Sequence, residues 1–457
     1  MLNRAGVSEL LQIGPSSTAL KRDILLLLIG LSLAAVFTLQ LWFLEHNSAF
    51  HYVTSQLRVV DPTYRPTWAA QGVIIALSLI ETTLLLVLFF RVFSGPRLRL
   101  FSIVAIAISF GLMSFAALKS GVVASADPYF YAVYGKLPTW RAAYDPPLNP
   151  FHDALTPLNL FANQQVPCVY GPLWLFVDRL ELSTATTVAQ TLAAQRVAGI
   201  MMLLGLLWAL RQARFSSALI VAVALNPWIF FEFVFNAHND IIAVLLITLG
   251  LALAGRFPVA AAALAASAGL IKISLILPAL LIFVRRPRVV ERVGYGGVTV
   301  LAFALASWAW GGIPYLHALN KQFAHNVGIT GLHTAGIALI VHAAFAVVAI
   351  AATVVALLYG LVSTTVAWSY FAISVRVFPW YALWGAPYAL LDQRRAQVFF
   401  AFLPFMASML TFADYSPSLF KFPILALALA VWLLTLKRID AYALFRSAVP
   451  RGRVAMT

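Results

Sequence analysis

The stretch ILLLLIGLSLAAVFTLQLWFL, residues 24–44, contains no charged side chain and is long enough to cross a lipid bilayer as one helix. The hydrocarbon core of a bilayer is about 30 Å thick and a helix rises about 1.5 Å per residue, so roughly 20 apolar residues span it. The stretch lacks a convincing small-residue cleavage site, and Arg4, Lys21 and Arg22 precede it. We therefore expect an uncleaved first transmembrane helix with the N-terminus in the cytoplasm.

Composition extends this expectation to the whole chain. Of the 457 residues, 62% are hydrophobic and only 10% are charged, whereas soluble domains have about 25% charged residues. Apolar runs long enough to span recur as far as residue 436 and leave no room for a separate soluble domain. The sequence therefore predicts an all-α, polytopic transmembrane helical bundle with about 14 hydrophobic segments, built as a single domain over residues 1–457. The one cysteine, Cys168, excludes an intramolecular disulfide.

The positions of the basic residues indicate which loops face the cytoplasm. The net charge is +15, and most of the 31 Lys and Arg residues lie in alternate loops, including 91–99, 211–214, 285–288 and 437–438. Such loops are cytoplasmic by the positive-inside rule. We therefore expect a multi-pass protein of the inner (plasma) membrane with both termini cytoplasmic, and no nucleic-acid partner, because the charge is not gathered in one patch.

One connection is much longer than the others. Residues 121–186 are expected to form a large extracytoplasmic loop with short amphipathic pieces at 151–163 and 171–181. Residues 312–333 are expected to form a second outer loop. The absence of any other long polar stretch makes the first loop the place to look for chemistry.

Two apolar segments are read in more detail. Residues 216–235 are expected to form one helix. The stretch 258–284 is basic at both ends but too short for two full spans, so it predicts two short helices that meet near Lys272 on the extracytoplasmic side.

The long loop begins with a candidate general base. Asp127 stands in Asp-Pro-Tyr at the rim of the membrane, where a carboxylate can accept the proton of a sugar hydroxyl. The bland alternative is that Asp127 caps the following helix. Tyr129 and Tyr131 offer aromatic faces on which sugars stack, and Lys136 and Arg141 are candidates to orient an anionic or polyhydroxylated ligand.

A second polar group lies at the corner Asn236–Asp240. His238 and Asp240 are further catalytic candidates and Asn239 a substrate-binding one, and Glu232 one turn earlier is placed to face the same cavity. The alternative is a polar turn between two helices. Asp240 begins a helix, where a carboxylate is stabilised.

Two cations are candidates for binding a phosphate. Lys272 lies in an otherwise apolar stretch, and Arg376 lies at the outer end of a hydrophobic segment. The alternative for each residue is that its side chain snorkels to the membrane interface. An arginine is able to bind phosphate with two parallel hydrogen bonds.

The histidines show no metal-ligand spacing, and the sequence has no P-loop, no GxGxxG and no Asp-x-Asp pair. A nucleotide-sugar donor is therefore not indicated.

Several motifs, in order along residues 100–390, resemble the GT-C superfamily of glycosyltransferases that use polyprenyl-phosphate sugars. The likeness is to bacterial polyprenyl-phosphomannose-dependent mannosyltransferases, of the α-1,6 type and the glycosyltransferase 87 type. The motifs are Asp127–Gly135, Tyr144–Phe151, Tyr170–Trp174, Asn226–Trp228 with His238–Asp240, Gly269–Lys272 and Pro379–Trp384. The resemblance implies that Asp127 is the catalytic base and adds Trp380 and Tyr381 to the substrate-binding residues. Many members have two adjacent acidic residues in this loop, whereas Ala126 precedes Asp127 here. We therefore expect no cofactor and no metal site, and dependence on a divalent metal ion is left as the alternative.

Together these observations predict an inverting transfer of a hexose, mannose first, on the extracytoplasmic face. The expected partners are a polyprenyl-phosphate sugar donor, a glycolipid or glycan acceptor and membrane lipid. The alternatives are a multi-pass transporter or flippase of a lipid-linked sugar, which would need a polar path across the membrane, and a non-enzymatic membrane scaffold.

Overall fold

The chain is mostly helical in the part that the computed structural model describes, which comprises residues 17–47, 68–89, 100–121, 125–329, 335–360, 383–384, 387, 400–405 and 408. No strand occurs in these ranges. Five helices are long and apolar enough to cross a membrane, and they are Leu20–His46, Ala69–Val87, Leu100–Lys119, Val188–Gln212 and Val289–Lys321. The all-α class and the membrane-compatible helices expected from the sequence are therefore confirmed for this part of the chain.

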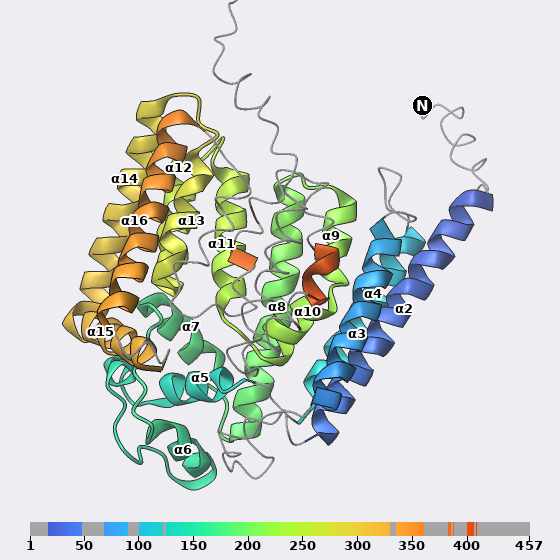
Figure 1. The fold of residues 1–457 in the computed structure, drawn as a ribbon, viewed down its shortest axis with the longest axis horizontal. Helices are drawn as coiled ribbons and strands as arrows, with labels where there is room; N and C mark the ends of the chain where they lie inside the picture. Colours follow the sequence, from blue (N-terminus) through green and yellow to red (C-terminus); the bar gives the residue numbers. More distant parts are fainter. Residues whose placement is uncertain are drawn as a thin grey trace, which may run out of the picture.

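The first three helices pack together at one side of the molecule (Figure 1). They are α2 (Ser17–His46), α3 (Trp68–Val87) and α4 (Leu100–Lys119). A polar contact fixes α4 against α2, because the Ser102 hydroxyl donates to Asp23 Oδ1 at 2.7 Å. α4 ends near Ser120 and delivers the chain to the site.

The central helices begin with α8 (Val188–Gln212). The segment expected as one helix over 216–235 is bent by 51° between Ser217–Ala224 and Pro227–Phe235, so that expectation was wrong. Proline at the start of the second piece has no N–H to continue the first helix, and the Asn226 side chain accepts from Trp228 N at 3.1 Å. The pieces are α9 (Ser217–Ala224), α10 (Pro227–Phe230) and the π-helical turn Phe231–Phe235.

The next helices are α11 (Asp240–Leu253) and α12 (Pro258–Ile271), which lie against each other. After α12 the chain is extended at Lys272 (φ −149°, ψ 120°) and then re-enters helix as a 3₁₀ turn and α13 (Ile276–Leu280). The break near Lys272 that the sequence predicted is thus present. It leaves the lysine at a junction instead of on a helix face.

The last described helices are α14 (Val289–Ala306), α15 (Gly312–Ile329) and α16 (Ala335–Tyr359). Residues 312–333 were expected to form a loop, and α15 shows that most of them are helical. Gly312 turns the chain with φ +57°, a conformation that glycine adopts without strain. Tyr315 and Ala318, three residues apart, are both buried, so the segment gains stability as a packed amphipathic helix.

Residues 125–186 form short helices gathered at one end of the bundle (Figure 1). They include α5 (Asp127–Lys136), α6 (Asn159–Ala162) and α7 (Pro172–Glu181). Helical pieces therefore occur within both ranges where amphipathic segments were expected. The ring of Tyr144 from this segment packs on Tyr315 of α15 at 5.3 Å between centroids.

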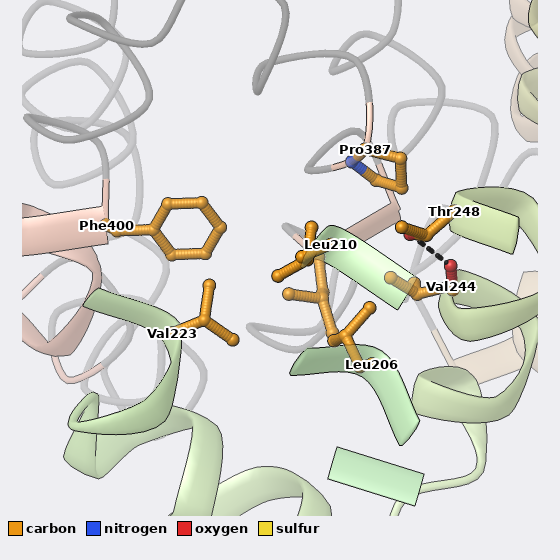
Figure 2. Close-up of a pocket in the computed structure, with 8 residues that line it drawn as sticks. Leu206, Leu210, Val223, Val244, Thr248, Pro387 and Phe400 are labelled. Carbon is orange, nitrogen blue, oxygen red and sulfur yellow. Dashed lines mark hydrogen bonds between the residues drawn. The ribbon is translucent and has the colours of Figure 1, made fainter. Parts of the chain in front are cut away.

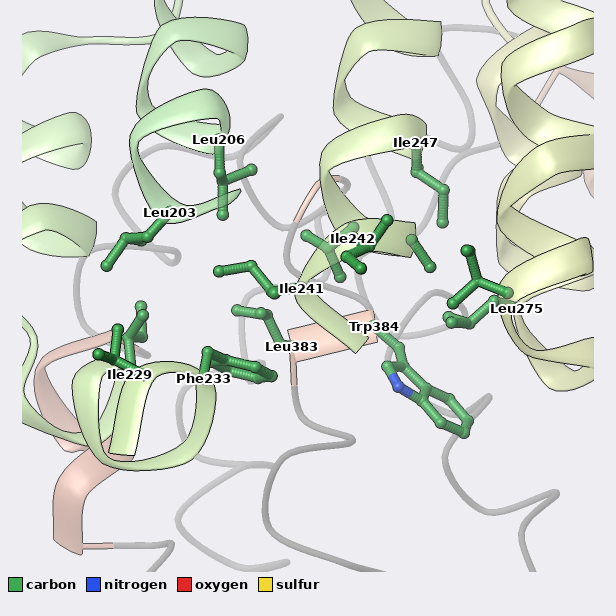
Figure 3. Close-up of a cluster of buried hydrophobic side chains, with 14 of the residues drawn as sticks. Leu203, Leu206, Ile229, Phe233, Ile241, Ile242, Ile247, Leu275, Leu383 and Trp384 are labelled. Carbon is green, nitrogen blue, oxygen red and sulfur yellow. The ribbon is translucent and has the colours of Figure 1, made fainter. Parts of the chain in front are cut away.

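The core beneath the site is apolar and joins elements distant in sequence. Figure 3 shows Leu203 and Leu206 of α8, Phe233 of the π turn and Ile241 of α11 facing one another, with Leu383 beside them. α8 approaches the π turn closely at Gly199, where an added Cβ would lie 2.1 Å from the Phe233 carbonyl oxygen. This packing holds the π turn in place.

An apolar pocket lies farther along the same helices (Figure 2). It is lined by Leu206, Leu210, Val223, Val244, Thr248, Leu383, Pro387 and Phe400. The Thr248 hydroxyl already donates to the Val244 carbonyl at 2.7 Å. Thr248 is about 12 Å along α11 from Asp240 at 1.5 Å per residue, so the pocket is separate from the polar residues described next.

Candidate active site

Asp127 is the first residue of α5 and does not act as its cap. The cap position is Ala126, and no side chain caps the helix. The carboxylate is 30% exposed, and the helix N-terminus favours its negative charge. Its Oδ2 accepts from the Tyr131 hydroxyl at 3.4 Å and lies 3.2 Å from His238 Nδ1. The capping alternative is therefore not supported, and the carboxylate is held through one oxygen.

His238 links two carboxylates. Its Nδ1 faces Asp127, and its Nε2 lies 3.3 Å from Oε2 of Glu232. The imidazole is completely buried and the Glu232 side chain is 4% exposed. Burial lowers the pKa of His238, but the hydrogen bonds and charges of Asp127 and Glu232 outweigh it and raise the pKa to about 9. Burial raises the pKa of Asp127, yet the His238 hydrogen bond and charge, together with Lys272, bring it below its usual value. Both shifts favour an imidazolium paired with a carboxylate.

The corner that presents His238 is built by the local backbone. After the π turn, Ala237 adopts φ 51°, and the His238 N–H donates to the Glu232 carbonyl at 3.0 Å. α11 then begins at Asp240. π-helical turns recur at functional sites because they displace side chains from regular helical positions, and here the turn brings Glu232 and His238 together.

Lys272 forms a second ionic cluster. Its Nζ lies 3.0 Å from Asp240 Oδ1, which also accepts from the Trp384 indole N–H at 2.5 Å. The ammonium group lies 5.0 Å from the Trp384 ring centroid and 5.7 Å from that of Tyr170. Side-chain exposure is 11% for Lys272 and 0% for Asp240. The lysine therefore points into protein and does not snorkel.

Tyrosines join the two clusters. The Tyr131 hydroxyl, which contacts Asp127, also lies within hydrogen-bond distance of the Tyr170 hydroxyl at 3.1 Å. Burial keeps the pKa of Tyr131 well above its usual value, so its hydroxyl remains a donor. Tyr170 precedes Gly171, whose N–H donates to the Ile271 carbonyl at 2.9 Å, next to Lys272. Asp127 and Lys272, distant in sequence, thus border one site.

Several residues expected at the site lie elsewhere. Lys136 is at the other end of α5, about 13 Å from Asp127 by helical rise, and its ammonium group donates to the Leu182 carbonyl. Arg141 is exposed and lies over the Trp140 ring. Tyr129 is buried with its ring stacked on Phe161, 4.7 Å between centroids. α5 turns Tyr129 to another face and places Lys136 at its far end, and Arg141 lies in the following 3₁₀ turn. A role of these three residues in binding the ligand of Asp127 stays a prediction.

The remaining expectations divide into two groups. Asn239 is 2% exposed and lies between His238 and Asp240, and its side-chain amide has no hydrogen-bond partner among the described residues. Arg376, Trp380 and Tyr381 lie outside the described residues. Tyr170 and Trp384 were not selected as site residues, although each stands in a motif that had been recognised.

The described residues contain no group of three or more His, Cys, Asp or Glu side chains that could hold a metal ion.

Residues 67–286 match the family model described as alpha-(1->6)-mannopyranosyltransferase, N-terminal domain, of the MptA_B family. The matched part of the chain is thus similar to this mannosyltransferase family. The match includes Asp127, Glu232, His238, Asp240 and Lys272, and it confirms the resemblance stated from the motifs. The protein is accordingly a glycosyltransferase enzyme. Comparison with curated proteins and with solved structures found no match.

Proposed function

We propose that this MptA_B-family protein transfers mannose from a polyprenyl-phosphate donor to a hydroxyl of a glycan or glycolipid acceptor, with inversion and with Asp127 as general base. The observation that supports this most is the asymmetry of the Asp127 carboxylate. His238 and Tyr131 both contact Oδ2, and Oδ1 makes no hydrogen bond or ion pair with the rest of the described chain. A partly exposed, ionised oxygen is thereby left for the acceptor.

The reaction balances with the residues at hand. Asp127 Oδ1 takes the proton of the acceptor hydroxyl while the hydroxyl oxygen of the acceptor attacks the anomeric carbon of the donor sugar. The bond between that carbon and the phosphate oxygen breaks, and the electron pair leaves with the polyprenyl phosphate. A single displacement inverts the anomeric configuration. Lys272 offers a fixed positive charge to the departing phosphate, which needs no acid catalyst because it is a stable anion.

Asn239 is assigned to the transferred hexose. It stands between His238, which contacts Asp127, and Asp240, which pairs with Lys272. The transferred sugar, which is bonded to the phosphate and is attacked by the acceptor, would lie there. An amide carries both donors and acceptors, and burying one without partners costs about 1–3 kcal/mol. Sugar hydroxyls would satisfy it.

We place the site on the extracytoplasmic side of the membrane. The basic residues Arg211, Arg214 and Arg256 follow the ends of α8 and α11 that are opposite to the site, and Arg286 donates to the Gly255 carbonyl at 3.1 Å in the same region. A basic end of this kind is cytoplasmic by the positive-inside rule. A lipid-linked donor suits the other side, where nucleotide sugars are absent.

The test is to incubate membranes containing the protein with radiolabelled polyprenyl-phosphate mannose and a short α-(1→6)-mannooligosaccharide. We expect a product extended by one mannose with an α-(1→6) linkage. No product, or a product formed equally well from GDP-mannose with the lipid carrier depleted, would refute the proposal.

A further inference from the structure

Glu232 approaches His238 from the side opposite to Asp127. Its Oε2 lies 3.3 Å from His238 Nε2, and it also accepts from the Asn236 side-chain amide at 3.3 Å. Glu232 comes from the π turn, His238 from the following corner and Asp127 from α5. Three elements therefore converge on one imidazole.

The contacts determine the protonation state of this imidazole. Carboxylates accept hydrogen bonds and do not donate them, and only the imidazolium form of histidine has N–H donors at both nitrogens. A neutral His238 would turn a lone pair toward either Asp127 or Glu232. The arrangement thus favours the charged form, despite complete burial of the ring.

We propose that Glu232 is a positioning residue that keeps His238 as an imidazolium, so that His238 holds Asp127 ionised with Oδ2 occupied and Oδ1 turned to the acceptor. This inference rests on the proposed role of Asp127 as base. Glu232 touches neither substrate nor reacting atoms in this scheme, and it acts through His238.

The other charged groups around the imidazole have partners of their own. Lys272, at the junction after α12, and Asp240 of α11 form their own ion pair. Arg196 of α8 donates to the Phe235 and Ser120 carbonyls. The Tyr131 hydroxyl of α5 lies 3.4 Å from Asp127 Oδ2 and 3.1 Å from the Tyr170 hydroxyl. If Asp127 were the only carboxylate in contact with His238, the proton between them could reside on either the imidazole or the carboxylate. The second carboxylate makes the histidine the preferred location.

The experiment measures kcat/KM for mannosyl transfer against pH for the wild type and for Glu232→Gln. In the wild type we expect an alkaline limb near the His238 pKa of about 9. Removing an opposite charge in contact shifts a pKa by about 1–3 units, so in Glu232→Gln this limb should move down by about 1–3 pH units. Glu232→Asp retains the charge and should keep the limb near its wild-type position even if the rate falls.

Two further variants separate this role from a structural one. Glu81→Gln makes the same change at a buried glutamate of α3, away from the site, and should leave both limbs in place. His238→Gln cannot titrate and should lose the alkaline limb. A Glu232→Gln enzyme with wild-type limbs and only a lower rate would overturn the inference, as would a limb that persists in His238→Gln. Absence of transfer by the wild type would instead overturn the proposed function.

Discussion

The Lys272–Asp240 pair allows a direct test of where the donor phosphate binds. Replacing Lys272 alone would leave Asp240 buried and unpaired, and breaking a buried pair from one side costs about 3–5 kcal/mol. The double variant Lys272→Gln with Asp240→Asn avoids this penalty, because two amides replace the two charges and can still hydrogen-bond. Its effect on catalysis then reports the loss of the cation.

The size of the effect follows from the contacts of the ammonium group. Lys272 Nζ has three N–H donors, one of which meets Asp240 Oδ1 at 3.0 Å. The Trp384 and Tyr170 rings are 5.0 and 5.7 Å away, and a phosphate oxygen at the site would accept from another N–H of the same ammonium group. A hydrogen bond between charged groups is worth about 1.5–3 kcal/mol. At about 1.4 kcal/mol per tenfold change, the donor KM should rise about 10- to 150-fold.

The assay titrates donor and acceptor separately in membranes that contain equal amounts of folded protein. Asp240→Asn alone keeps the cation but breaks the pair from the other side, so it is compared at the same amount of folded protein, and it should not raise the donor KM above the wild-type value. If the double variant raises the acceptor KM and leaves the donor KM unchanged, Lys272 does not bind the phosphate. The search would then move to Arg376.

Three further changes test separate parts of the structure. Asp127→Asn should abolish transfer while the protein still elutes as a single peak in size-exclusion chromatography, and wild-type-like turnover would remove Asp127 from the role of base. Gly171→Ala places a Cβ 2.0 Å from the Leu270 carbonyl oxygen, so it should lower the thermal unfolding midpoint and the activity together, and an unchanged midpoint would contradict the packing. Burial raises the pKa of Asp178, whose carboxylate oxygens lack partners in the described structure, well above its usual value. A carboxyl pKa that is higher in the folded than in the unfolded protein lowers the free energy of unfolding as the pH rises above the unfolded-state pKa. The stability of Asp178→Asn relative to the wild type should therefore increase from mildly acidic to alkaline pH by up to about 1.4 kcal/mol per pH unit. An equal relative stability at both ends of this pH range would refute the expectation.

Some site residues were evident from the chain because they interrupt an apolar pattern. Asp127, His238 and Lys272 each lie in or beside apolar segments, where a polar side chain is energetically costly in a membrane protein. All three border the candidate site. The sequence did not reveal the partner of each group. Glu232 meets His238 only because a π turn displaces it, and Trp384 meets Asp240 across a long separation in sequence.

Other candidate residues lie close together in the sequence but apart in the structure. Lys136 and Tyr129 lie close to Asp127 in the sequence, but α5 turns them to other faces or its far end. Residues 312–333 were expected to form a loop, yet Tyr315 and Ala318 of α15 are buried at a helical spacing.

The sequence by itself determined that this is a helical membrane protein, since a bilayer admits few other ways to satisfy the backbone, and its motifs indicated the mannosyltransferase family. The break at Lys272 was also readable, from the length of chain between two basic flanks. Only the tertiary structure decided which carboxylate pairs with which cation. Asp127 and Asp240 are both acids at the same end of the bundle, and the packing of α8, the π turn and α11 leaves one partly exposed beside an imidazolium and buries the other against a lysine. Distances of a few ångströms between elements distant in sequence decide these pairings, and no pattern along the chain encodes them.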